Sequence, residues 1–348
     1  MTTVITGGAG FIGINLAHRL LSRGRRVVVF DNLSRAGVER NVEWLRATHG
    51  DRAGIRAGDT RDRAALRDAL SGAAHVFHFA AQVAVTTSLA DPVRDFETNG
   101  RGTLNLLEEL RAMNPRPTLV FTSTNKVYGH LEDLELRREG TRYEPADGIA
   151  RTLGIGEGRP LRFCSPYGCS KGAADQYVLD YARTFGLPAA VFRMSCIYGP
   201  HQYGNEDQGW VAHFLISALE GRPITIYGDG YQVRDILYID DLLDAFELAV
   251  GRMDKIAGTA FNIGGGPSNT VSLIELLDMI GRMRGERPQV RFESWRAADQ
   301  RYYVSDTRRF QAASGWAPRV GVREGVARLY QWLAESRGIA VETARATP

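Results

Sequence analysis

A tyrosine and a lysine four residues apart could carry out proton transfer. Tyr167 and Lys171 lie in the string SPYGCSK, and residues at i and i+4 share one face of a helix. The phenol of a free tyrosine titrates near pH ~10, and a neighbouring ammonium lowers its pKa by favouring the phenolate. A phenolate can take the proton of a substrate hydroxyl. Because this spacing also occurs by chance, the prediction depends on the elements that position the pair.

Hydroxyl side chains cluster in the string TSTNKVYG, at the end of an apolar run that predicts a strand over residues 118–123. Ligands bind outside the carboxyl ends of parallel strands. We therefore expect the Thr124 hydroxyl to donate to a reacting oxygen or to relay its proton. The alternative for a threonine at a strand end is local capping of the backbone.

Lysine is scarce in this chain, and two of its lysines fall in these motifs. Of 43 basic residues only three are lysines, namely Lys126, Lys171 and Lys255. The arginine guanidinium effectively never loses its proton, whereas the lysine ammonium is compact and its pKa can be tuned. We therefore interpret Lys126 and Lys171 as functional, with a solvated surface lysine as the alternative for Lys126.

A glycine-rich turn near the start of the chain predicts a dinucleotide site. The string TVITGGAGFIG reads as a strand that runs into Gly7, Gly10 and Gly13, with a helix over residues 11–23. Glycine lets the backbone approach a pyrophosphate closely, and the N-terminus of the helix supplies N–H donors and the positive end of its dipole. The spacing is GxxGxxG rather than GxGxxG, and a glycine turn without a ligand is the alternative.

Residues at the ends of the following strands indicate which cofactor binds. Asp31 ends the run VVVFD, where a carboxylate accepts hydrogen bonds from the adenosine ribose and repels a 2′-phosphate, which favours NAD over NADP. Because Arg35 lies nearby in the sequence, NADP remains an alternative cofactor. Asp59 is placed to contact the adenine, with capping of the helix expected over residues 61–70 as the alternative. Small residues such as Ala80, at the end of the fourth strand, would let a cofactor lie flat across the sheet.

Strands and helices that would position these residues alternate along the chain. The strand candidates are 27–30, 75–80, 118–123 and 189–194, and the helix candidates are 11–23, 92–113, 166–185, 271–284 and 321–336. Such alternation implies right-handed βαβ units and a parallel sheet. We therefore predict an α/β fold, with a Rossmann-type doubly wound parallel sheet and a smaller C-terminal α/β substrate domain.

The length of 348 residues corresponds to about two domains. We expect residues 1–195 to form the NAD-binding domain, including a loop over residues 130–164, because a loop of that length is usually functional. Residues 196–337 are expected to form the substrate domain, interleaved in part with the first. Residues 338–348 read as a frayed tail.

Composition and charge exclude several classes of protein. The chain has no run of about 18 apolar residues, so no transmembrane helix is expected, and its N-terminus carries no signal-peptide pattern. Three cysteines, Cys164, Cys169 and Cys196, do not make a disulfide framework. A net charge of +3 is too weak to indicate a nucleic-acid partner. We expect a reduced, cytoplasmic protein without membrane contacts, and we assign no metal ligands.

The motifs TGGAGFIG, HFAAQ, TSTNKVYG, SPYGCSK and VRD resemble those of the extended short-chain dehydrogenase/reductase family of nucleotide-sugar epimerases and dehydratases. The resemblance covers residues 3 to about 332. It implies a tightly held NAD, a nucleotide-sugar substrate, a transient keto-sugar and a catalytic site of Thr124, Tyr167 and Lys171. It also implies a homodimer, or a tetramer, built through a four-helix bundle of the helices near 92–113 and 166–185.

Within the family, longer strings such as SPYGCSKGAADQYVLDYAR and DQGWV resemble the 2-epimerases of CDP-activated deoxyhexoses. Many 4,6-dehydratases carry Asp-Glu directly after the catalytic threonine, where this chain has Asn125 and Lys126. Many 4-epimerases and dehydratases carry asparagine where Cys196 stands. Against this, Arg162 and Cys164 in RFCSPYG depart from the family's usual DFHSPYG, which bears on the identity of the sugar. The alternatives are a 4-epimerase, a 4,6-dehydratase and a non-catalytic NAD-binding sensor.

The motifs and the resemblance together imply which residues hold the ligands. The expected cofactor residues are Gly7, Gly10, Phe11, Ile12, Gly13, Asp31, Asn32, Ser34, Arg35, Asp59, Thr60, Ala80, Ala81, Gln82, Asn99, Thr122, Tyr167, Lys171 and Met194. The expected substrate residues are Thr124, Asn125, Lys126, Gln208, Arg234, Arg296 and Asp299. A forked guanidinium suits phosphate oxygens, so Arg234 and Arg296 are expected at the substrate diphosphate. Surface ion pairs are the alternative for both.

Overall fold

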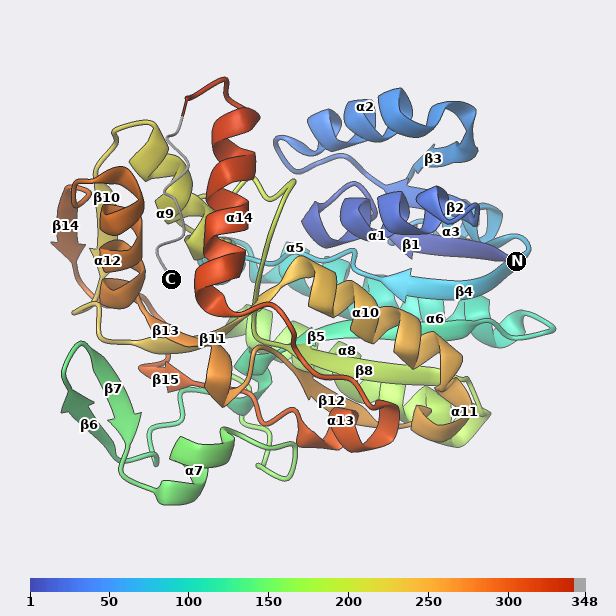
Figure 1. Ribbon diagram of the computed structural model, residues 1–348. Helices are drawn as coiled ribbons and strands as arrows, with labels where there is room; N and C mark the ends of the chain where they lie inside the picture. Colours follow the sequence, from blue (N-terminus) through green and yellow to red (C-terminus); the bar gives the residue numbers. More distant parts are fainter. Residues whose placement is uncertain (341–348) are drawn as a thin grey trace.

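A parallel sheet of seven strands forms the centre of the computed structural model, which describes residues 1–340 (Figure 1). The strands lie in the order β12-β8-β5-β4-β1-β2-β3, and every neighbouring pair is parallel. They are β1 (Thr2–Thr6), β2 (Arg26–Asp31), β3 (Ala53–Ala57), β4 (Ala73–His78), β5 (Thr118–Thr124), β8 (Ala189–Met194) and β12 (Ala260–Ile263). The predicted doubly wound α/β fold is confirmed.

Helices cover both faces of this sheet, and the strands are apolar on both faces as a result. Consecutive strand residues point to opposite faces, and Val4 and Ile5 of β1 are both completely buried, in different core clusters. The Ile5 cluster includes side chains of α1 (Phe11–Ser22), α2 (Val38–His49) and α10 (Ile239–Gly251), and the Val4 cluster includes those of α3 (Arg63–Leu70), α6 (Gly102–Ala112) and α8 (Ser165–Phe185). Strands buried on both faces read as continuous apolar runs, which made them visible in the sequence.

The strand order reverses at β1, which lies between β2 and β4. The chain moves from β1 towards β2 and β3 on one side, and the later strands continue on the other side. At such a switch point the connections diverge and leave a crevice outside the carboxyl ends of the strands. The motifs with candidate chemistry follow the strands at this edge.

Smaller sheets and further helices form the remainder of the structure. One sheet contains β9 (Cys196–Tyr198), β11 (Val233–Tyr238), β13 (Thr270–Ser272) and β15 (Tyr302–Tyr303), and another pairs β10 (Ile224–Tyr227) with β14 (Val290–Glu293). The helices are α9 (Trp210–Leu219), α11 (Met253–Ile256), α12 (Leu273–Arg284), α13 (Arg308–Ser314) and α14 (Val322–Glu335). The division into domains at residue 196 stays a prediction. β12 follows that residue in the sequence and yet pairs with β8 in the central sheet, so the two segments are interleaved at this point.

Two segments differ from the sequence-based expectations. Residues 130–164, predicted as a loop, contain the hairpin β6 (Leu136–Glu139) and β7 (Arg142–Pro145) and the helix α7 (Gly148–Leu153). Most side chains of β6 are exposed, so these short strands leave no alternating pattern. The hairpin is instead held by tertiary contacts, including a hydrogen bond from Tyr143 N to Tyr231 O of 2.9 Å.

The chain is helical over residues 92–112, as predicted, but a π-helical turn interrupts the α-helical repeat. After α4 (Val85–Ala90), the chain forms α5 (Pro92–Phe96), a π-helical turn (Glu97–Arg101) and then α6, which ends at Ala112. The π-helical turn adds one residue to the helical repeat. The spacing of the apolar residues around it did not reveal this extra residue. The helices predicted over 11–23, 166–185, 271–284 and 321–336 are confirmed as α1, α8, α12 and α14.

The last part of the predicted tail, residues 341–348, lies outside the described residues. Among the helices of residues 1–340, none combines the length and the apolar character needed to cross a membrane.

Candidate active site

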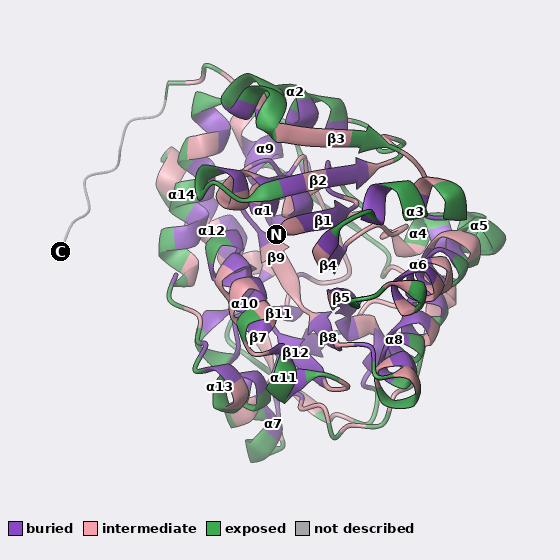
Figure 2. Ribbon diagram, turned by 90° about the vertical axis from the view of Figure 1, so that its right-hand side faces the viewer, coloured by how far each residue is buried: buried purple, intermediate pink, exposed green. Residues whose placement is uncertain are grey.

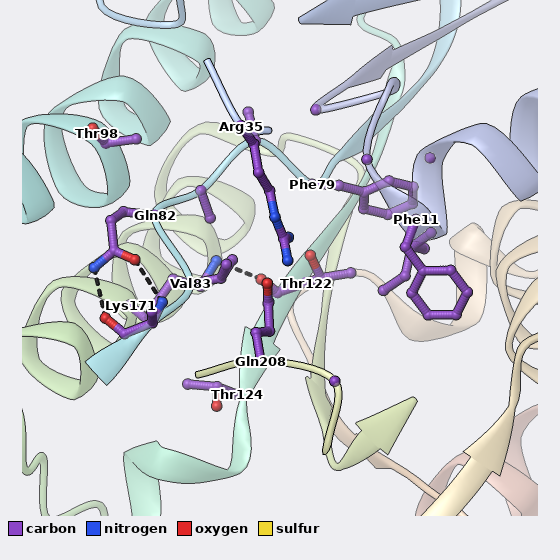
Figure 3. Close-up of a pocket in the computed structure, with 18 of the residues that line it drawn as sticks. Phe11, Arg35, Phe79, Gln82, Val83, Thr98, Thr122, Thr124, Lys171 and Gln208 are labelled. Atoms are coloured by element: carbon purple, nitrogen blue, oxygen red, sulfur yellow. Dashed lines mark hydrogen bonds between the residues drawn. The ribbon is translucent and has the colours of Figure 1, made fainter. Parts of the chain in front are cut away.

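A cavity of about 660 Å³ follows the carboxyl ends of the central strands (Figure 3). Every expected cofactor residue except Asn99 lines it, from the glycine turn after β1 to Met194 at the end of β8. Thr124, Asn125 and Gln208 of the expected substrate residues line it as well. The fold therefore brings together motifs that lie almost 200 residues apart in the sequence.

The glycine turn is closely packed and has no room for larger residues. Gly7 has a φ of +68°, and a Cβ atom there would lie 2.5 Å from Ala80 N. A Cβ atom at Gly13 would lie 2.5 Å from Gly8 Cα. Gly10 caps α1 without a side chain, so the first amides of the helix remain accessible to a phosphate. This cradle fits the pyrophosphate of a dinucleotide.

The acidic residues after β2 and β3 face the same cavity. Asp31 accepts hydrogen bonds from Leu33 N at 2.9 Å and Ala9 N at 3.1 Å, which places its carboxylate beside the glycine turn. Burial raises the pKa of Asp31, and these amides and Arg35 lower it in part. Arg35 extends into the cavity (Figure 3).

The alternative assignment of Asp59 as a helix cap is wrong. Asp62 caps α3, since its carboxylate accepts from Ala64 N at 2.9 Å and Ala65 N at 3.1 Å. Asp59 instead accepts from Asn32 Nδ2 at 2.9 Å and pairs with Arg61, which holds the pKa of Asp59 well below its usual range. Asn32 and Asp59 thus form one polar wall at the end of the cavity.

Lys171 is buried at the centre of the site, with an exposed fraction of 4%. Its Nζ donates to Thr122 O at 2.6 Å and lies 4.2 Å from the centre of the Phe121 ring. Burial lowers the pKa of Lys171 to about 7, while the charges of Asp175 and Asp95 raise it in part. The ammonium is therefore close to its titration point near neutral pH.

Tyr167 precedes Lys171 by one turn of α8, as the spacing predicted, and lines the cavity with Thr124. We expected the pKa of Tyr167 to be lowered by the ammonium, and in the structure it is raised. Burial raises the pKa of Tyr167 to about 12, and the hydrogen bond with Thr124 lowers it only in part. The Lys171 ammonium donates to Thr122 O and is not among the groups that shift the pKa of Tyr167, so in the chain alone burial of the phenol decides its direction.

Asn99 lies behind the cavity wall and supports Gln82. The Asn99 amide accepts from Gln82 N at 2.8 Å and donates to Gln82 O at 3.0 Å. Gln82 and Ala84 both line the cavity, and Figure 3 shows the Gln82 side chain there. Asn99 therefore holds the loop after β4 instead of lining the cavity as expected.

Four expected substrate residues lie outside the cavity lining, and three of them form an ionic cluster. Arg234 Nη2 donates to Asp299 Oδ1 at 2.7 Å, and Lys126 Nζ lies 3.8 Å from the same oxygen. Asn125 Nδ2 donates to Gln300 Oε1 at 3.2 Å, which places the cluster directly behind a cavity residue. Desolvation lowers the pKa of Lys126, and Asp299 raises it in part.

Arg296, the fourth of these residues, lies against a loop that borders the cavity. Its Nη1 donates to Glu206 O at 2.6 Å and lies 3.4 Å from an Asp207 oxygen, and its guanidinium stacks 3.8 Å above the Tyr227 ring. These contacts agree with the alternative given in the sequence analysis, in which Arg296 forms a surface ion pair.

The sequence analysis missed several residues that line the cavity. Among them are Thr87, Arg94, Thr98, Ser195, Cys196, Ile197, Gln202, Asn205, Asp207, Gly209, Trp210 and Val211. The string DQGWV did point to part of this set, because its residue Gln208 was expected to bind the substrate. Within residues 1–340 no group of three or more His, Cys, Asp or Glu side chains is arranged to hold a metal ion.

Comparison with known proteins agrees with this geometry. The chain is 43% identical over 343 residues to CDP-paratose 2-epimerase of Salmonella typhi, covering 95% of this chain and 99% of that protein. It is 32% identical to a dTDP-glucose 4,6-dehydratase of Streptomyces antibioticus, covering 97% and 93%. The crystal structure of UDP-glucose 4-epimerase of Thermus thermophilus in complex with NAD superimposes with a TM-score of 0.80 and 33% identity, covering 98% of this chain and 100% of that one.

The family comparison gives the broadest assignment. The model of the NAD dependent epimerase/dehydratase family matches residues 3–264, which include the glycine turn, the catalytic candidates and all seven strands of the central sheet after Thr2. Together with the relatives above, this match shows that the chain belongs to the NAD-dependent epimerase/dehydratase family.

Proposed function

We propose that the protein inverts carbon 2 of a CDP-activated deoxyhexose, of the CDP-paratose or CDP-tyvelose type, through a transient keto-sugar. The observation that carries the proposal is the arrangement of Thr124, Tyr167 and Lys171 along one cavity with the glycine turn. The choice of carbon 2 and of a CDP-sugar is supported by the 43% identity to a CDP-paratose 2-epimerase.

The residues of the chain divide the work between holding the cofactor and moving a proton. NAD⁺, when bound, supplies a hydride acceptor and a positive charge. Gly7 and Gly13 leave room for its pyrophosphate at the N-terminus of α1, and Asp31 would accept from its ribose. Positive charge near a phenol lowers its pKa, so the raised pKa of Tyr167 in the chain alone makes proton release dependent on the loaded site.

Tyr167 would take the proton of the sugar hydroxyl at its phenolic oxygen and return it when the ketone is reduced. Thr124 lines the cavity with Tyr167 and lowers the pKa of its phenol in part, and its hydroxyl would donate to the same reacting oxygen. Since the proton and the hydride both return to the sugar, the reaction causes no net oxidation.

Elimination of water needs an acid–base pair that this site does not offer next to Thr124. Asn125 is engaged by Gln300, and Lys126 donates to Ala298 O at 3.0 Å. Neither residue is a carboxylic acid. This favours an epimerase over a 4,6-dehydratase, and the presence of Thr124, Tyr167 and Lys171 in one cavity favours an enzyme over a sensor.

We also propose a homodimer formed through α5 and α8, which lie in the two segments, 92–113 and 166–185, expected to form the interface. Large apolar side chains are exposed on these helices, with exposed fractions of 71% for Val93, 53% for Phe96 and 47% for Tyr177. The helices lie together on one side of the molecule (Figure 2). A second copy of the same surface would cover these side chains, since exposed apolar patches mark interaction sites.

A cytoplasmic location is part of the same proposal. Cys164, Cys169 and Cys196 are all free thiols, and free thiols are typical of a reducing compartment.

The substrate assignment predicts the fate of hydrogen at the inverted carbon. In deuterated buffer, a CDP-deoxyhexose should be inverted at carbon 2 with its original hydrogen retained, because the hydride returns to the same carbon. NMR of the products measures both position and isotope. Deuterium at the inverted carbon would contradict hydride return, and inversion at carbon 4 instead would identify a 4-epimerase. CDP-glucose and dTDP-glucose should yield no accumulating 4-keto-6-deoxy sugar.

Tyr167→Phe should reduce kcat by roughly 10²–10⁴-fold, the usual contribution of a general acid–base group. Tyr181→Phe is the matched control, because Tyr181 lies on the same helix and its hydroxyl bonds Glu108 at 2.6 Å. The control should retain activity. Near wild-type turnover by the Tyr167 variant would remove this residue from the mechanism.

Arg234→Ala should weaken binding of free CDP by roughly 10–150-fold, since a charge-assisted hydrogen bond contributes about 1.5–3 kcal/mol. Arg234→Lys should recover only part of the affinity, because an ammonium cannot form a bidentate fork. Calorimetric titration measures both, with Arg222→Ala, in an exposed pair with Glu220, as the control. Unchanged affinity in the Arg234→Ala variant would leave Arg234 with a purely internal role.

Val93→Glu should convert the dimer to monomers, because it places a charge in the centre of the proposed interface. Analytical ultracentrifugation should show a dimer for the wild type and for Ile149→Glu, a control at another exposed apolar side chain, 69% exposed. A monomeric wild-type chain would rule out the interface.

A further inference from the structure

A buried carboxylate lies behind the catalytic helix and has no part in the mechanism derived above. Asp95, in α5, is completely buried. Its Oδ2 accepts from Ser170 Oγ, and its Oδ1 accepts from Gln82 Nε2 at 2.9 Å and from Asn99 Nδ2 at 3.2 Å. All three donors are neutral. A buried charge is unfavourable unless it is paired or well hydrogen-bonded, so this carboxylate needs an explanation beyond packing.

The three donors come from three segments that border the site. Gln82 belongs to the loop after β4 and lines the cavity. Ser170 lies on α8 between Tyr167 and Lys171, and its hydroxyl also lies 3.2 Å from Tyr167 O. Asn99 lies in the π-helical turn, an irregularity that is frequent at functional sites. One carboxylate therefore fixes the cavity loop, the π-helical turn and the catalytic helix relative to one another.

The charge of Asp95 also acts on both titratable residues of the catalytic pair. It raises the pKa of Lys171 and that of Tyr167. Burial raises the pKa of Asp95 itself, and the hydrogen bonds from Ser170 and Gln82 and the charge of Lys171 lower it in part. A negative charge in a low-dielectric surrounding favours the protonated form of its neighbours. The remaining charged or titratable groups that face this cluster are Asp175, with its partner Arg193, and Cys169 and His78.

Asp175 differs from Asp95 in how its charge is used. It forms a bidentate pair with Arg193, with both contacts at 2.9 Å, and its charge raises the pKa of Lys171 more than that of Asp95 does. It raises the pKa of Lys171 but is not among the charges that affect Tyr167. Asp95 is the carboxylate that acts on both members of the pair.

We propose that Asp95 is a positioning residue of this site, which ties Gln82, Asn99 and Ser170 together and whose buried charge keeps the Lys171 ammonium protonated beside Tyr167. Its effect on turnover rests on the proposed function, whereas its effect on Lys171 does not. Asp95 does not touch the cavity itself and acts through the residues that it binds.

The scarcity of lysine makes a direct test possible. Protein labelled with ¹³C at the lysine ε-carbons should give signals from only Lys126, Lys171 and Lys255, which Lys→Arg variants assign one at a time. A pH titration by NMR then reports the pKa of Lys171 in the intact chain, without substrate. Asp95→Asn should lower this pKa by about one unit, because a neighbouring charge shifts a pKa by that order, and should leave Lys255 unchanged.

Two further variants separate charge from packing. Asp95→Ser is a second neutral replacement of different size, and it should lower the pKa of Lys171 as Asp95→Asn does; it also carries the test if the asparagine variant does not fold. Ser170→Ala breaks the same hydrogen-bond network but keeps the carboxylate, so the pKa of Lys171 should not fall. Glu97→Gln, two residues from Asp95 and paired with Arg101 at 3.5 Å, should have no effect.

The outcomes distinguish this inference from the proposed function. An unchanged Lys171 titration in both neutral variants would overturn it, and so would an equal fall in Ser170→Ala, which would point to packing alone. If the inference holds, the pH profile of kcat in Asp95→Asn shifts to lower pH, because removing the charge lowers the pKa of both Tyr167 and Lys171. A chain that inverts no nucleotide sugar but shows the Lys171 shift would refute the proposed function and leave this inference standing.

Discussion

The burial of the Lys171 ammonium is the constraint on which the rest of the site depends. Moving an ammonium out of water favours its neutral form, and the chain compensates with a carbonyl in contact, an aromatic ring and two carboxylates at longer range. His78 nearby stays uncharged, since burial and Lys171 lower its pKa to about 3. Its ring lies 2.6 Å from Thr6 Oγ1 and 3.0 Å from Thr103 Oγ1. Lys171 and the neighbouring His78 therefore do not both carry a positive charge at these strand ends.

A second consequence is that the catalytic helix is fixed by residues from distant parts of the chain. The Arg193 guanidinium on β8 forms a bidentate pair with Asp175 on α8 and also donates to Tyr128 Oη at 3.2 Å. Tyr128 in turn donates to Asn262 Oδ1 at 2.7 Å. Asn262 belongs to β12, which lies beyond most strands of the smaller sheets in the sequence. The return of β12 to the central sheet thus completes the support of α8, so the two expected domains are structurally dependent on each other.

The sequence predicted the parts of the structure that depend on local chemistry. The glycine turn, the buried strands and the YxxxK pair could be recognised because each needs particular residue types at fixed spacing. The ionic cluster of Lys126, Arg234 and Asp299 could not, since its members lie far apart in the sequence and each charge alone resembles a surface charge. The expectation that the pKa of Tyr167 is lowered was wrong for a related reason. The spacing shows which charges are near but not how deeply the phenol is buried.

The glycine turn and the ionic cluster behind the cavity differ in how their polar groups are occupied. The glycine turn presents backbone amides at the start of α1 that no capping side chain occupies, so a cofactor adds contacts there without breaking any. In the ionic cluster behind Asn125, Arg234 and Lys126 already face Asp299, and a diphosphate that bound there, as the sequence predicts, would have to replace part of that interaction. Only the difference between the two interactions contributes to affinity. Such a balance suits a reaction in which the cofactor stays bound while each sugar nucleotide must enter, turn over as a ketone and leave.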